Sequence, residues 1–167
     1  MKFQLFGMAC ALISATFSGP VQSAATKPNV PEMLQKPSEF AAAIQDLGYL
    51  ATISKMDDGD PQITSSSGGS RFIIMFSECE ANEKCQLISF YKGFTYEQED
   101  FAKFKPISDR WNGRFWISKT AVGEDTIHLA YSYDVSGKGV TSENFKAVFE
   151  RWAYEMDKLK NEFDEGQ

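Results

Sequence analysis

The sequence predicts an α+β fold: a mostly antiparallel sheet of about six strands, flanked by an N-terminal helix, a short middle helix and a long C-terminal helix. Three observations support this prediction. Apolar residues recur at helical spacing near the end of the chain, short apolar or alternating segments bounded by turn residues fill its middle, and these segments come in runs of four and two. Strands joined by short turns favour antiparallel pairing.

The first residues have the order of a secretory signal peptide. Lys2 supplies a positive charge, an apolar run extends from Leu5 to Phe17, and small residues follow at Ser23-Ala24-Ala25. The run is too short to span a bilayer, which takes about 20 residues. We expect residues 1–25 to be removed after Ala25, or after Ser23, which makes the mature protein periplasmic or secreted. The alternative is a lipoprotein signal on Cys10, whose preceding residues lack the usual leucine.

Residues 26–37 form an extended lead-in, because they contain three prolines. A single domain over residues 38–163 follows, and residues 164–167 are a tail. The domain opens with a helix that Ser38 caps and that Gly48 ends, since a glycine suits a left-handed C-terminal cap.

Four strands come next, separated by turns. The third is apolar on both faces, so we expect it to be central in the sheet and covered on both sides. The strands are Tyr49–Ser54, Gln62–Ser65, Arg71–Phe76 and Gln86–Tyr91, with turns over Asp57–Pro61 and Ser66–Gly69.

The second half begins with a short helix over Thr95–Phe104, which Pro106 interrupts. Another helical turn from Ile107 ends at Asn112-Gly113, a pair suited to a positive φ angle. Two strands follow, Arg114–Thr120 and Thr126–Tyr133. Thr141 or Ser142 then caps a long helix with one apolar stripe, made by Phe145, Val148, Phe149, Trp152, Met156, Leu159 and Phe163.

The charge of the chain argues against two classes of partner. The formal net charge is −6, and removing residues 1–25 takes away Lys2 and no acid, which gives −7. Nucleic acids and anionic membranes require clustered Lys and Arg, which the chain lacks. No second apolar run is long enough to anchor the protein, so we expect no nucleic-acid partner and no stable membrane anchor.

Cys79 and Cys85 are the cysteines that remain after processing, in the acidic segment SECEANEKC. A zinc site requires more cysteine or histidine ligands than the chain offers, and a thioredoxin-type centre uses C-x-x-C spacing. In an oxidising compartment the pair is expected to form a structural disulfide, with a redox-active pair and a metal site as less favoured alternatives.

No catalytic set is evident in the sequence. His128 is the single histidine, and no nucleophile elbow, H-E-x-x-H motif, P-loop or dinucleotide fingerprint is present. The acidic turn at Asp57–Asp60 would need Glu at the twelfth position of a calcium loop, where the chain has Gly68. We therefore expect a protein that is not an enzyme, with no catalytic residue, no metal and no cofactor.

Several local signatures resemble the YbjN family, also labelled bacterial sensory transduction regulators, over residues 38–163. They are Leu47-Gly48-Tyr49, the connection Phe76…Cys79…Cys85, Trp111-Asn112, Gly139–Phe145 and Trp152. Asp109 and Lys138 depart from the family pattern. The resemblance implies a fold related to type III secretion chaperones, a small binding or chaperone-like module, and no established catalytic residues.

The candidate interaction surface is aromatic. It comprises Trp111, Asn112, Trp116, Phe94 and Tyr96. The alternative for the first two is structural, with Trp111 plugging the core beneath a helix end that Asn112 caps.

We expect binding of an unidentified protein partner, and a homodimer is possible. A second hypothesis is a small-ligand or lipid-binding module with an aromatic-lined groove between the sheet and the last helix, and a thiol–disulfide enzyme is a third.

Overall fold

The computed structural model describes residues 30–165, and it confirms the α+β fold. Its main sheet has six strands in the order β2-β3-β4-β5-β7-β6, and all neighbouring strands are antiparallel. The strands are β2 (Thr52–Lys55), β3 (Pro61–Ser67), β4 (Ser70–Ser77), β5 (Leu87–Thr95), β6 (Lys119–Val122) and β7 (Thr126–Asp134). A separate two-stranded ribbon pairs β1 (Met33–Leu34) with β8 (Val140–Thr141).

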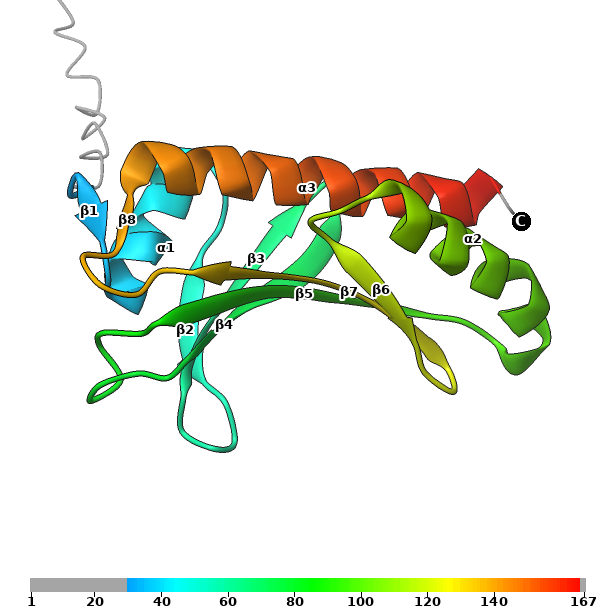
Figure 1. Ribbon diagram of the computed structural model, residues 1–167, viewed down its shortest axis with the longest axis horizontal. Helices are drawn as coiled ribbons and strands as arrows, with labels where there is room; N and C mark the ends of the chain where they lie inside the picture. Colours follow the sequence, from blue (N-terminus) through cyan, green and yellow to red (C-terminus); the bar gives the residue numbers. More distant parts are fainter. Residues whose placement is uncertain (1–29, 166–167) are drawn as a thin grey trace, which may run out of the picture.

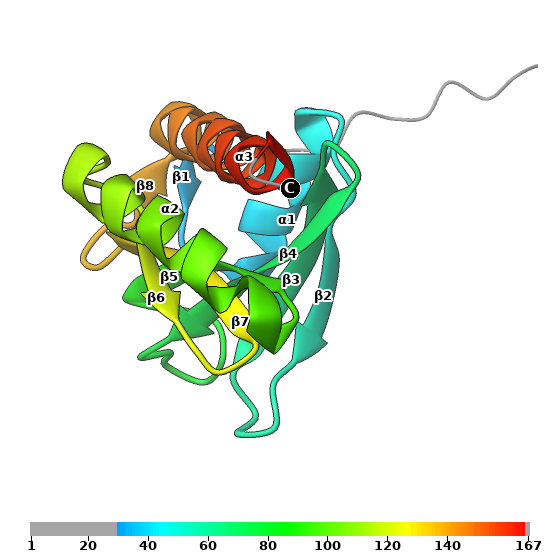
Figure 2. The same cartoon turned by 90° about the vertical axis from the view of Figure 1, so that its right-hand side faces the viewer.

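The helices lie together on one face of the six-stranded sheet, as the two cartoon views show (Figures 1 and 2). They are α1 (Pro37–Asp46), α2 (Phe101–Arg114), which follows a short 3-10 turn η1 (Gln98–Asp100), and α3 (Ser142–Glu165). The opposite face of the sheet carries no helix within the described residues. β4 is central, as expected, but it is covered on one face only, because Ile73 and Met75 point to that helix-free face and are half-buried.

The predicted apolar stripe of α3 is confirmed and forms the centre of the core. Its residues pack on aromatic side chains of the sheet and of α1, with ring centroids 4.9 Å apart for Phe40–Phe145 and 5.4 Å apart for Phe90–Trp152. Seven apolar side chains of α3 are buried: Phe145, Phe149, Trp152, Ala153, Met156, Leu159 and Phe163. Burial of so much aromatic surface is the main stabilising term of the domain.

The helix ends follow local chemistry. Thr141 caps α3 by accepting a hydrogen bond from the Asn144 backbone N–H at 3.1 Å, as predicted. α1 begins at Pro37, one residue before the predicted cap Ser38. Proline is pre-organised for the first helical position, and the Glu39 carboxylate accepts hydrogen bonds from the backbone N–H groups of the two residues before that proline. The N-terminal cap therefore lies closer to the N-terminus than predicted. Gly48 has φ +87° and closes α1 as expected.

The middle helix is the main correction to the predicted elements. β5 continues to Thr95, and α2 then runs without interruption through Pro106 to Arg114. Pro106 is exposed, so water can solvate the carbonyl that its missing N–H leaves unpaired, while the opposite side of the helix buries apolar side chains. Gly113 lies inside α2 and has no positive φ, so β6 begins at Lys119 instead of Arg114.

The signal peptide, its cut site, Cys10 and residues 26–29 of the predicted lead-in lie outside the described residues. Of that lead-in, residues 33–34 form strand β1 and are not simply extended chain. No helix in the part of the chain that the structure describes is both long and apolar enough to cross a bilayer.

Candidate functional site

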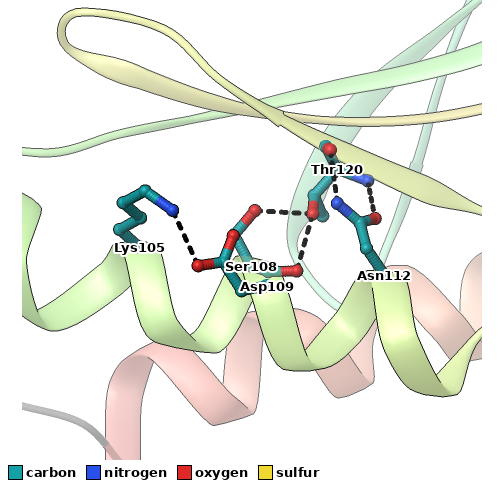
Figure 3. A network of polar contacts seen from close by, with 5 residues as sticks. All are labelled: Lys105, Ser108, Asp109, Asn112 and Thr120. Atoms are coloured by element: carbon teal, nitrogen blue, oxygen red, sulfur yellow. Dashed lines mark hydrogen bonds and ion pairs between the residues drawn. The ribbon is translucent and has the colours of Figure 1, made fainter.

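Asn112, on the last turn of α2, binds an edge strand of the sheet. Its Nδ2 donates to the Thr120 carbonyl oxygen at 2.9 Å, and its Oδ1 accepts from the Thr120 backbone N–H at 2.8 Å (Figure 3). Because β6 pairs with β7 on one side only, these two backbone groups face the open edge. Asn112 therefore acts as a one-residue substitute for a seventh strand, and it does not cap a helix end as the structural alternative proposed.

A second pair of bonds joins the same elements. The Ser108 and Thr120 hydroxyl groups are 2.6 Å apart, and the Thr120 hydroxyl also donates to the Ser108 carbonyl at 3.1 Å (Figure 3). Both side chains are buried, with 1 % and 7 % exposure. Lys105, one turn earlier, pairs with Asp109 on the exposed side of α2, at 2.7 Å. The buried side of the helix is thus bonded to β6, while its outer side is solvated.

Trp111 belongs to the core and not to the predicted interaction surface. It is 0 % exposed, and its Nε1–H donates to the Ser118 hydroxyl at 3.1 Å. Its ring stacks on Phe115, with centroids 3.8 Å apart. The plug predicted as the alternative is what the structure shows, because Trp111 shares the buried face of α2 with Phe104 and Ile107.

Trp116 is the exposed member of the predicted surface. It is 90 % exposed, and its neighbour Ile117 is 48 % exposed. Both lie in the connection between α2 and β6, whose two ends are held in place. Phe115 stacks on the core tryptophan, and the Lys119 Nζ donates to the Phe115 carbonyl at 2.6 Å. The connection therefore presents two large apolar side chains to solvent from an anchored backbone.

Phe94 and Tyr96, the remaining predicted residues, are far along the chain from Trp116 and line a different feature. They border a half-open cavity of about 460 Å³ between the end of β5, the start of α2 and the end of α3. These elements meet at the end of the molecule that faces the viewer in Figure 2. Phe94 and Phe104 each pack against Phe163 of α3, at 5.4 and 5.3 Å between centroids. Tyr96 is oriented by its hydroxyl, which donates to the Gly123 carbonyl at 2.7 Å.

Lys92 lines the same cavity and was not among the site residues predicted from the sequence. It alternates with Ile88 and Phe90 on the helix-covered face of β5, where those two side chains are 0 % exposed. Partial burial lowers the pKa of Lys92 below its ordinary value, since desolvation disfavours the charged ammonium. The predicted strand ended at Tyr91, four residues before the observed end of β5 at Thr95. Extending the alternation by one step would have placed a lysine in an apolar row.

Cys79 and Cys85 lie at disulfide-bond distance, with 2.13 Å between their sulfurs. They close the connection between β4 and β5, in which Ala81 and Asn82 have positive φ angles of 53° and 61°. Cys85 is 4 % exposed. Burial makes the Cys85 sulfur poorly accessible to an attacking thiolate, whereas Cys79 is half-buried.

His128 lies on the helix-free face of the sheet and forms a hydrogen bond with the Tyr91 hydroxyl through Nδ1. Gly93 stands directly opposite it across the β5–β7 pair, which leaves space for the ring. Within residues 30–165, no group of three or more His, Cys, Asp or Glu side chains is arranged to hold a metal ion.

Comparison with known proteins gives one match. The model of the YbjN family, described as "Putative bacterial sensory transduction regulator", matches residues 36–165. No curated protein and no solved structure matches the chain. The matched range contains every element from α1 to α3, including Asn112 with its two hydrogen bonds to Thr120 and the Cys79–Cys85 pair. The chain therefore belongs to the YbjN family.

Proposed function

We propose that this protein is an exported, non-enzymatic binding module, regulatory or chaperone-like, that engages a protein partner through Trp116 and Ile117. The observation that carries the proposal is the 90 % exposure of Trp116 on a connection held by the core at both ends. Tryptophan is the residue most enriched at the energetic centres of protein interfaces. An anchored backbone also loses little conformational entropy on binding.

Family membership supports the coarser part of this proposal, because the family description is that of a regulator. The finer part is our own. Export rests on the order of charges and apolar residues in positions 1–25, and it places the cysteine pair in a compartment that allows a disulfide.

Site-specific photo-crosslinking in living cells tests the partner surface. A benzophenone amino acid placed at Ile117 is expected to give an adduct of defined mass. The same probe at Tyr154, a 57 % exposed aromatic residue on α3, serves as the matched control and should give none. Trp116→Ser in the Ile117 probe strain should abolish the adduct.

The mass of the adduct distinguishes a foreign partner from a second copy of the chain, which would give twice the mass. The proposal is wrong if position 117 gives no adduct, or if Trp116→Ser leaves the adduct unchanged. Equal labelling from position 154 would indicate indiscriminate contact and would also contradict it.

A second candidate function is small-ligand binding. It is favoured by the cavity of about 460 Å³ beside Phe94, which lies between the sheet and α3 as that hypothesis requires.

A further inference from the structure

Lys92 lies on the helix-covered face of β5, where the other side chains are apolar. Along the helix-covered face of β5 the row reads Ile88, Phe90, Lys92, Phe94, and strand pairing places Lys92 beside Leu129 of β7. Its ammonium group lies 5.3 Å from the centre of the Phe94 ring. A lysine in such a row costs stability unless its charge is compensated, so its presence calls for an explanation beyond packing.

The charge of Lys92 is not compensated within the described part of the chain. Apart from the contact with the Phe94 ring, Lys92 forms no ion pair and no side-chain hydrogen bond there. The other charged groups around the cavity are differently placed. Lys160 pairs with Asp164, Asp100 lies 3.8 Å from Lys103, and Glu97 is exposed. Of the two lysines that line this cavity, Lys92 is thus the one with no acidic partner among the described residues.

The other residues that line the cavity indicate what kind of ligand would fit it. Phe94, Phe104 and Phe163 form one aromatic cluster that can cover an apolar body. The three acidic residues that line the cavity, Glu97, Asp100 and Asp164, would repel a ligand with several negative charges. A volume of about 460 Å³ suits a small organic molecule.

We propose that this cavity binds a small monocarboxylic acid with an apolar or aromatic body, its carboxylate on the Lys92 ammonium and its body against Phe94, Phe104 and Phe163. The inference rests on the second candidate function, small-ligand binding, and names its ligand class. It does not depend on the partner surface at Trp116.

The test compares an acid with its uncharged counterpart. The purified protein is titrated with 4-phenylbutyrate and with 4-phenylbutyramide, and binding is followed by two-dimensional NMR. The acid is expected to bind with Kd below about 1 mM and at least about tenfold more tightly than the amide, since a charge-assisted hydrogen bond contributes that much. The shifted signals should include those of Phe94, Phe104 and Phe163.

Lys92→Met keeps most of the apolar stem and removes the charge. It should abolish the roughly tenfold preference for the acid and leave binding of the amide unchanged. Lys55→Met, at an exposed lysine of the edge strand β2, is the matched control and should bind as the unaltered protein does. Should Lys92→Met fail to fold, Lys92→Gln serves the same purpose.

The outcomes separate the ligand class from the wider function. Equal affinity for acid and amide at this cavity overturns the carboxylate assignment and leaves small-ligand binding standing. No shift with either compound, or shifts confined to other surfaces, overturns both. An acid preference that persists in the Lys92 variant shows that another cation binds the carboxylate, which also contradicts the proposal.

Discussion

Replacing Asn112 with alanine should destabilise the domain by about 2–3 kcal/mol. The change removes two hydrogen bonds, of 2.8 and 2.9 Å, to the backbone of Thr120, and each neutral bond contributes about 1 kcal/mol net. It also leaves a donor and an acceptor of a 7 % exposed residue without partners, which adds to the loss. Alanine is the better helix former, and this lowers the cost by a few tenths of a kcal/mol.

Urea unfolding followed by tryptophan fluorescence measures this loss. Asn161→Ala on α3 is the control, because Asn161 is exposed and forms no side-chain hydrogen bond within the described residues, and it should be neutral or slightly stabilising. Amide hydrogen exchange at Thr120 should also accelerate in Asn112→Ala. A loss below about 0.5 kcal/mol, or unchanged exchange at Thr120, would refute the view that Asn112 replaces a missing strand.

Three further predictions concern other parts of the molecule. Replacing both Cys79 and Cys85 with serine should lower the free energy of unfolding by about 2 kcal/mol, the loop-entropy value for so short a ring, while the Ile117 crosslink persists. Lys92→Met should raise the urea midpoint at neutral pH, because it removes a partly desolvated ammonium; an unchanged or lower midpoint would contradict this. Burial raises the pKa of Tyr91, and burial with the charges of Tyr133 and Glu155 raises the pKa of Tyr131, so the unfolded chain loses these phenolic protons at lower pH than the folded chain does. Stability should therefore fall as the pH rises above about 10, and Tyr91→Phe with Tyr131→Phe should flatten that decline in unfolding curves measured between pH 8 and 11.

Patterns that act within one element were predictable from the sequence. The stripe of α3 depends only on its own spacing, and Thr141 and Gly48 act on the backbone groups next to them. Pro106 was misleading because its effect depends on its surroundings. A proline costs a helix less where the freed carbonyl is exposed to water, and the sequence does not show which side of α2 faces out.

The same error in the extent of α2 explains why Trp111 was assigned to the exposed surface together with Trp116. In the predicted elements Trp111 lies in a single helical turn from Ile107 to Asn112 and Trp116 lies in a strand from Arg114 to Thr120, and neither element shows which side chain is buried. When α2 extends to Arg114, Trp111 follows Phe104 and Ile107 on the buried face, and Trp116 lies beyond the helix end. Lys92 was missed for a similar reason, because the predicted strand ended at Tyr91, four residues before the end of β5, and so excluded Lys92.

The two candidate binding regions lie at opposite ends of α2, and this separation makes them experimentally independent. Phe104, near the start of the helix, lines the cavity, while Trp116 follows its end, and a helix of 14 residues spans about 20 Å. Substitutions so far apart without shared partners are expected to have additive effects. Trp116→Ser should therefore leave 4-phenylbutyrate binding intact, and Lys92→Met should leave the Ile117 crosslink intact. Asn112→Ala, by contrast, releases the helix from β6 close to Trp116 and far from Lys92, so it should weaken the crosslink more than it weakens the binding of the acid.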